Sequence, residues 1–178
     1  MALARVFNVD TNSTTGITIG STTPGTEFVL AYGTCGSNSE FNVSAVRVGT
    51  YSGSSASYPS NGTITFRLRR SSGTLLPAGG SGGNGTAAAI SASTQTSVST
   101  WYYSTLTNAT ATFATPGAVV WEQTIPCTAG ANWGEWFTPG FEINAGANAG
   151  TILALTYEYG AAGTSSAVNL MAGLVISE

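Results

Sequence analysis

The sequence predicts an all-β protein that folds as an antiparallel β-sandwich or jelly roll. Short segments in which apolar and polar residues alternate recur along the chain, and Gly, Pro, Asn and Ser residues separate them. Apolar residues at helical spacing are almost missing, and only the region around Ala87–Ala92 suggests a short helix. About nine or ten strands, without a repeat of fixed length, favour a sandwich over a solenoid or propeller.

The length of 178 residues fits a single domain over residues 1–178 with a core of its own. Residues 71–85 are the least complex part of the chain and end in the sequence GGSGGNG, which predicts a loop. No charged residue occurs from Ser71 through Trp121. Because charge cannot solvate this span, part of it is expected to pack on something.

Alternating patterns predict the individual strands in chain order. The expected strands are Ala4–Val9, Gly16–Gly20, Thr26–Tyr32, Phe41–Val48, Thr63–Arg69, Trp101–Leu106, Thr110–Phe113, Gly150–Tyr159 and Val168–Ile176. In the fourth of these, a phase slip is expected to place Phe41, Val43 and Ala45 on one face and Val46 and Val48 on the other.

Residues 119–143 hold three of the four tryptophans and are expected to form the heaviest part of the core. Alternation predicts a strand over Val119–Ile125, with Val119 and Trp121 on one face, that ends at Pro126. A second strand is expected over Trp136–Ile143. Two aromatic-rich strands joined by a Gly-containing loop predict a β-hairpin.

Charged residues make up only 7% of the chain, which has no lysine, no histidine and a net charge of −3. Uncharged polar and small side chains must therefore cover most of the surface. Two interpretations stay open: a surface that meets other subunits, or the polar surface of an extracellular β protein. Five arginines are too few for a nucleic-acid interface, so no nucleic-acid partner is expected.

The N-terminal residues lack the apolar core of an export signal, and no stretch approaches the roughly 18 apolar residues of a membrane helix, so no membrane partner is expected. The two cysteines, Cys35 and Cys127, are far apart in the sequence. They can form a disulfide only if their strands are neighbours; otherwise two free, buried thiols are expected.

Three of the five arginines, Arg67, Arg69 and Arg70, are close together in one predicted strand. Alternation places Arg67 and Arg69 on one face, and Arg70 on the other face with Phe66 and Leu68. Such a patch has the size to meet an acidic patch on a protein partner. The alternative is an ordinary solvated strand end.

The sequence offers no complete catalytic motif. Ser81 lies in a match to the G-x-S-x-G nucleophile elbow, but the chain has no histidine to act as its base. With no histidine, two distant cysteines and one aspartate, no metal or other cofactor is expected. The remaining enzymatic option is a glycosidase-like carboxylate pair, Glu135 with Glu142 or with Glu122, facing each other across the hairpin. We expect no enzymatic activity.

Several segments together resemble the capsid decoration, or cement, proteins of tailed bacteriophages. They are the N-terminal MALARVFNV, the strand TITFRLRR before the Ser/Gly-rich segment, the stretch from WEQTIP to WGEWFTPGFEI, and the final apolar strand NLMAGLVISE. The resemblance implies a jelly-roll-like fold and a symmetric homo-oligomer, a trimer first. It also implies a non-enzymatic role: a chain made in the host cytoplasm that binds the major capsid protein on the outside of the virion shell and stabilises it.

A function of another class stays open, that of a carbohydrate- or receptor-binding β-sandwich module on a phage tail or cell surface. The directions of Trp133 and Trp136 distinguish the two functions. Buried between sheets or at a subunit contact, these tryptophans are core or partner-binding residues; as an open shelf, they would stack on sugar rings. The expected partner-binding residues are thus Arg67, Arg69, Arg70, Trp133 and Trp136.

Overall fold

A computed structural model of the chain confirms the all-β prediction. It describes residues 6–10, 17–19, 25, 27–35, 40–51, 62–72, 77–78, 82–85, 88–89, 99–104, 112–113, 117–127, 133–139, 143–146, 151–160 and 168–178. These residues form fifteen strands and no helix, and all strand pairs are antiparallel.

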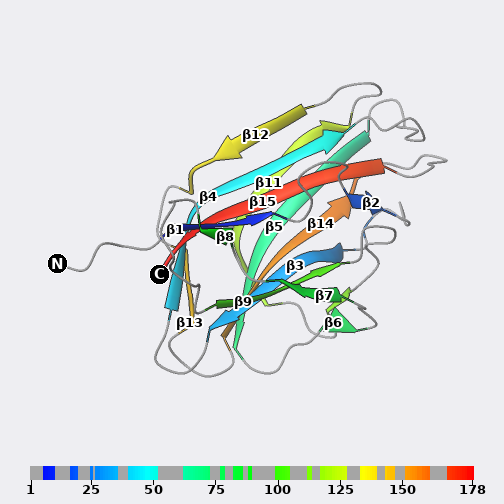
Figure 1. Ribbon diagram of the computed structural model, residues 1–178. Helices are drawn as coiled ribbons and strands as arrows, with labels where there is room; N and C mark the ends of the chain where they lie inside the picture. Colours follow the sequence, from blue (N-terminus) through cyan, green and yellow to red (C-terminus); the bar gives the residue numbers. More distant parts are fainter. Residues whose placement is uncertain are drawn as a thin grey trace.

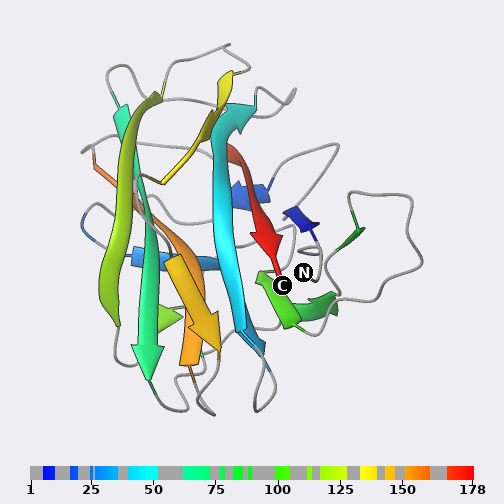
Figure 2. The same ribbon diagram turned by 90° about the vertical axis from the view of Figure 1, so that its left-hand side faces the viewer.

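Eight of the strands make a jelly roll. They are β1 (Val6–Asp10), β3 (Glu27–Cys35), β4 (Glu40–Tyr51), β5 (Gly62–Ser72), β11 (Ala118–Cys127), β12 (Trp133–Phe137), β14 (Thr151–Tyr159) and β15 (Val168–Ser177). The β4 sheet has the order β12-β4-β15-β1, and the β5 sheet has the order β11-β5-β14-β3. The chain changes sheet at every step between these strands except from β5 to β11, as the two Greek keys of a jelly roll require. Figure 2 shows the two layers, with β11, β5 and β14 on the left and β4 and β15 beside them.

The seven shorter strands extend this framework. They are β2 (Ile17–Ile19), β6 (Pro77–Ala78), β7 (Gly82–Gly85), β8 (Ala88–Ala89), β9 (Ser99–Ser104), β10 (Thr112–Phe113) and β13 (Ile143–Gly146). β8 pairs with β1, β9 with β3, and β7 with β9, so the segment between β5 and β11 adds strands to both sheets on the side opposite β11 and β12 (Figure 1).

Two sequence predictions for this segment need correction. Ala88 and Ala89 are strand residues paired with β1, so the helix around Ala87–Ala92 is wrong where the structure describes it. The predicted loop over 71–85 contains the end of β5 together with β6 and β7. Pairing with existing strands overrides the local preferences of alanine and glycine. The expectation that part of the uncharged span packs on something is confirmed by β9, whose Trp101 is fully buried.

The core lies between the two sheets. Its largest fully buried side chains are those of Trp101, Tyr157, Tyr159, Phe41 and Phe66. Residues 119–143 contribute less than predicted among the described side chains, because Trp121 and Phe137 are only half-buried at the margin of this core. The centre of the core is therefore built around Trp101 of β9.

The predicted hairpin of residues 119–143 does not form. β11 pairs with β5, while β12 pairs with β4, so the two strands belong to different sheets and do not pair with each other. Periodicity and a short loop are the same for a hairpin and for two such strands, which is why the sequence pattern did not distinguish them. β11 also continues through Pro126, because an edge strand tolerates a residue without an N–H.

Two β-bulges change the predicted faces. In β4, Val43 pairs with Ile176 and Ala45 with Val175, so Ser44 is the extra residue. The predicted phase slip is thus real, but it brings Phe41 and Val43 onto the same buried face as Val46 and Val48. In β11, Val120 is the extra residue between Val119 and Trp121. Val119 is therefore 44% exposed while Trp121 packs against the core, and these two residues do not share a face.

Gly33 of β3 makes room for Trp101, which pairs with it on β9. A Cβ atom at Gly33 would lie 2.6 Å from the Trp101 ring, far inside van der Waals contact. The indole instead packs across the bare backbone and lies 5.2 Å from the Phe41 ring, centroid to centroid. Glycine at position 33 is therefore required by packing, since no other residue leaves the indole in place.

We expect Gly33→Ala to lower the free energy of unfolding by about 1–3 kcal/mol, because a rigid, buried indole must move to admit the methyl group. Gly160→Ala is the matched control: its Cβ would meet the Thr63 hydroxyl at 2.5 Å, and a terminal hydroxyl can rotate away. Urea unfolding of both variants checks this prediction, and equal losses would contradict it.

The two cysteines lie at opposite ends of the β5 sheet. Cys127 pairs with Gly62 at the start of β5, while Cys35 is aligned, across β14, with the last residues of β5. Ten residues of strand separate these levels by about 30 Å, and two strands lie between β3 and β11. A disulfide needs Cα atoms within about 7 Å, so the two cysteines of one chain do not pair.

The unfolded protein is accordingly expected to titrate two thiols per chain whether or not it was first treated with reductant. The measurement is a thiol titration in urea, next to electrophoresis with and without reductant. A monomeric chain that yields no thiols until it is reduced would overturn the strand order of the β5 sheet.

Candidate functional site

The densest polar cluster of the described residues is on the outer face of the β5 sheet. Within β5, Phe66 and Leu68 are fully buried toward the core, and Arg67 and Arg69 alternate with them on the opposite side. This confirms the predicted common face of the two arginines. Arg70 lies at the end of the alternating run and is exposed.

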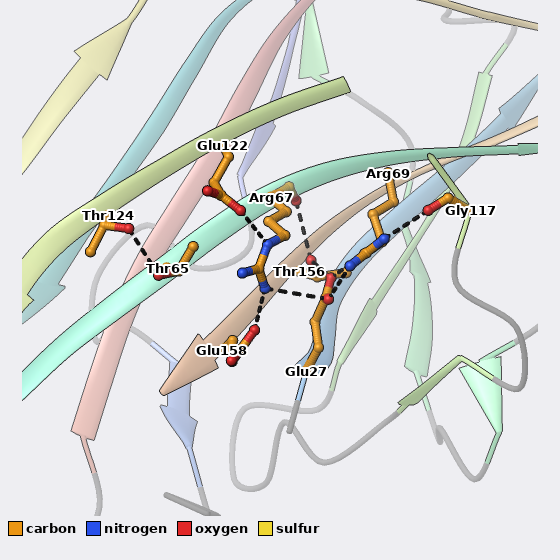
Figure 3. A network of polar contacts seen from close by, with 9 residues as sticks. All are labelled: Glu27, Thr65, Arg67, Arg69, Gly117, Glu122, Thr124, Thr156 and Glu158. Carbon is orange, nitrogen blue, oxygen red and sulfur yellow. Dashed lines mark hydrogen bonds and ion pairs between the residues drawn. The ribbon is translucent and has the colours of Figure 1, made fainter. Parts of the chain in front are cut away.

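Antiparallel register brings three glutamates from three different strands to these arginines. Arg67 is opposite Glu122 of β11 on one side and Thr156 of β14 on the other, while Glu158 of β14 is opposite Glu27 of β3. The polar side chains therefore form a continuous row across β11, β5, β14 and β3 (Figure 3).

Arg67 contacts all three carboxylates. Its Nε donates to Glu122 Oε2 at 2.5 Å, and its Nη1 donates to Glu158 Oε2 and, at 3.4 Å, to Glu27 Oε2. The Arg67 side chain is only 16% exposed, although it lies on the outer face of a sheet. Its neighbours cover it, so its ion pairs are shielded from water more than ordinary surface pairs.

Arg69 binds the Glu27 carboxylate in a bidentate ion pair. Its Nε donates to Glu27 Oε1 and its Nη2 to Glu27 Oε2, both at 2.5 Å, and its Nη1 donates to the Gly117 carbonyl at 2.7 Å. The Thr156 hydroxyl donates to Glu27 Oε1 as well. The planar guanidinium matches the carboxylate, and the Gly117 contact ties the entry of β11 to the same cluster (Figure 3).

Charge balance explains why both arginines are needed. Glu27 and Glu158 face each other directly across β3 and β14, and like charges in that position repel. Arg67 lies between them and contacts both. The cluster holds three carboxylates and two guanidinium groups, so it is close to neutral.

The pKa values follow this arrangement. Burial by itself would raise the pKa of Glu27, but hydrogen bonds from Arg69 and Thr156 and the charges of Arg69 and Arg67 lower it overall. Burial alone would lower the pKa of Arg67, but hydrogen bonds to Glu158 and Glu122 raise it overall. Glu27 stays a carboxylate and Arg67 a cation, so neither is prepared to transfer a proton near neutral pH.

Of the two predicted carboxylate pairs, the structure tests only Glu122 with Glu135, and that pair is not assembled as expected. Glu122 points outward from the β5 sheet and binds Arg67, while Glu135 belongs to β12 of the β4 sheet. They do not face each other across a hairpin, and Glu142 lies outside the described residues. Among the residues that the structure describes, no three His, Cys, Asp or Glu residues are grouped to hold a metal ion.

The predicted aromatic residues lie at one side of the sandwich. Trp121 of β11 and Phe137 of β12 come from different sheets, and their rings lie 6.0 Å apart at 54°. Trp133 and Trp136 pair with Thr50 and Arg47 through their backbone, but the directions of their side chains lie outside the described part of the chain. The described pair therefore forms a tilted contact that bridges the edges of the two sheets.

Comparisons of the chain with protein-family models, with curated proteins and with solved structures found no match. In the described part of the chain, no helix has the length and hydropathy to cross a membrane.

Sequence reasoning found Arg67 and Arg69 but missed Glu27, Thr156 and Glu158. These three residues are 40 to 129 positions away from the groups that they contact. Their only local signal is a charged or hydroxyl side chain among apolar neighbours of a strand. The acidic groups that face Arg67 and Arg69 belong to this chain and not to a partner. Only the order of the strands in the sheet reveals this, because the groups are far apart in the sequence.

We expect the stability of the protein to fall in acid through Glu27. The pKa of Glu27 is lowered in the folded state from its ordinary value of 4.5. Its contribution to the free energy of unfolding is therefore complete above pH 4.5 and is lost as the pH falls through the lowered pKa. Glu27→Gln should lower the free energy of unfolding at pH 7 by about 1–3 kcal/mol and flatten its decline in acid.

Glu40→Gln is the control, because Glu40 is exposed on β4 and lies outside the cluster. Urea unfolding at several pH values from 3 to 7 compares the two variants with the unchanged chain. Parallel pH profiles of the Glu27 variant and the unchanged chain would contradict the role of the cluster.

Proposed function

We propose that this chain is a non-enzymatic structural protein that binds the outside of a phage capsid shell and stabilises it. The observation that carries the proposal is the internal use of its few charges. Five of its thirteen charged side chains form one cluster within a single molecule, in which two guanidinium groups balance two of three carboxylates. Eight charged side chains remain for the rest of the 178 residues, and a chain with so little charge is poorly protected against association with neighbouring subunits.

The described carboxylates of this cluster support a role without catalysis. General acid catalysis needs a carboxyl group whose pKa is raised, and that of Glu27 is lowered. A glycosidase needs two carboxyl groups facing a shared site, whereas Glu122 is occupied by Arg67. These groups stabilise a sheet face and leave binding as the function to be tested.

The jelly roll is compatible with both candidate functions, because viral capsid proteins and lectins use it alike. Sugar binding by stacking favours aromatic faces that are open and flat. Trp121 is half-buried and tilted against Phe137, an arrangement that favours packing. Glycan binding therefore serves as the competing outcome of the experiment below.

The test is sedimentation of the purified protein with bare capsid shells of the phage that carries its gene. We expect the protein to co-sediment with assembled shells and not with unassembled capsid protein. Attachment should change less than about tenfold between 50 mM and 500 mM salt, because few charges are available to be screened. Shells with bound protein should rupture at a higher temperature, since a ligand of the assembled state stabilises it.

Arg67→Ala, Arg69→Ala and Arg70→Ala separate the roles of the three arginines in the same assay. The first two should lower the stability of the protein itself, while the exposed Arg70 tests a direct contact with the shell. A protein that binds no shell at any salt concentration, but is retained by a glycan array, would replace this proposal with the carbohydrate-binding function.

A further inference from the structure

The edges of the sheets differ between the two sides of the jelly roll. On the β1 and β3 side, β8 extends one sheet and β9 and β7 extend the other. On the opposite side, the β5 sheet ends at β11, which among the described strands pairs only with β5. Figure 2 shows β11 at the outer margin of its layer. A terminal strand presents backbone N–H and C=O groups to any strand that can align with it.

β11 carries two of the features that restrict pairing at an edge. The bulge at Val120 and the proline at Pro126 limit regular pairing to the residues between them. Trp121–Ile125 remains as a short, regular stretch. Its only charged residue is Glu122, 51% exposed, so charge does little to prevent a second strand from approaching.

We propose that β11 pairs with β11 of a second copy of this chain, antiparallel, around a two-fold axis that passes at Gln123. This register places Glu122 opposite Thr124 of the second copy and Trp121 opposite Ile125. The β5 sheets of the two copies then continue into each other. The inference concerns self-association alone and does not depend on binding to a capsid.

Pro126 indicates which residues of β11 point their backbone groups to the free edge. Proline in a sheet lies where its missing N–H would face away from the neighbouring strand. Because alternate residues point the same way in the plane of the sheet, Glu122 and Thr124 also direct their N–H and C=O groups outward. In the single chain the Thr124 C=O accepts a hydrogen bond from Gln123 Nε2 at 3.0 Å, and pairing with a second copy replaces this bond. The pairs of Glu122 with Thr124 are then hydrogen-bonded pairs and supply about four backbone hydrogen bonds.

Other two-fold registers are less favourable. An axis at Glu122 would place two carboxylates directly opposite each other, which destabilises a cross-strand pair. An axis at Thr124 would place Pro126 opposite Glu122 and remove hydrogen bonds at both ends. The axis at Gln123 avoids both faults and makes the pairing region coincide with Trp121–Ile125.

Side chains on both faces match in this register. On the outer face, Thr65 and Thr124 already contact each other through their hydroxyls at 2.9 Å, and Glu122 binds Arg67. The two rows join into one polar row, because Glu122 of each copy meets Thr124 of the other. On the inner face, the half-buried Trp121 gains a β-branched neighbour, a favourable cross-strand combination.

A cysteine at position 123 tests the axis directly. Gln123 would face its own copy in a non-hydrogen-bonded pair, with Cα atoms about 4.5 Å apart, within the range of a disulfide. We expect Gln123→Cys to form a disulfide-linked dimer under mild oxidation. Thr124→Cys is the matched control, because two such residues would lie about 8 Å apart and link poorly. Two copies of the native Cys127 would lie about 27 Å apart, so the unchanged chain should not link through it.

A second pair of variants tests the hydrogen bonds without a new cysteine. Thr124→Pro removes an outward N–H and should abolish the dimer in analytical ultracentrifugation. Thr124→Val keeps that N–H and should leave the dimer intact, although both variants lose the hydroxyl contact with Thr65. Far-UV circular dichroism verifies that each variant keeps its β structure.

The outcomes decide the inference either way. Rapid linking at position 123 but not at 124, with loss of the dimer in Thr124→Pro alone, supports it. Equal linking at both positions, a strict monomer, or a trimer that Thr124→Pro leaves unchanged would overturn it. A monomer that still binds capsid shells would overturn the two-fold contact and leave the proposed function standing.

Discussion

The fold depends on one close contact, that of the Trp101 indole with the bare backbone of Gly33. Through it the segment between β5 and β11 enters the core, since the same indole packs on Phe41 of the other sheet. Its Nε1 donates to Ser99 Oγ at 3.0 Å, and Ser99 Oγ in turn donates to Glu178 Oε1 at 2.7 Å. A buried ring, a hydroxyl and a carboxylate thus connect β9 with the end of β15. Trp101 and Ser99, which belong to a span without a single charge, are thus held by packing and by hydrogen bonds that end on a carboxylate outside it.

The outer face of the β5 sheet is stabilised by a different kind of interaction. Four strands contribute one row of side chains in which Arg67 and Arg69 separate and bind three carboxylates. Isolated surface ion pairs contribute little to stability, but here Arg67, Arg69 and Glu27 are largely covered by their neighbours and several contacts are made at once. The inner face therefore joins the two sheets through apolar burial, while the outer face fixes the order of strands within one sheet.

Much of the fold could be predicted from the sequence, because strand periodicity is a local property. Alternation located the long strands and the common face of Arg67 and Arg69. It indicated the phase slip in β4 but placed Phe41 and Val43 on the wrong face, and it did not reveal the bulge at Val120, since one extra residue reverses the faces without altering composition. Nor did it reveal that Trp101, rather than Trp121, is the central indole, or that Glu27 and Glu158 face the arginines. Those facts depend on which distant strands become neighbours, and a single sequence carries no local signal for that.

The scarcity of charged residues also bears on how this chain associates with other chains. A β-sandwich exposes edges, and lysine is a common means of keeping edges apart. This chain has no lysine, and its arginines at positions 67 and 69 are committed to the outer face of the β5 sheet. Extra strands cover the edges beside β1 and β3. Among the described residues of β11, the features that hinder edge pairing are a bulge, a proline and one glutamate. Because those features bracket a short regular stretch without interrupting it, they select a register more than they prevent pairing. An edge of this kind favours a defined partner strand over indiscriminate aggregation, and the strand most often available to it is its own copy.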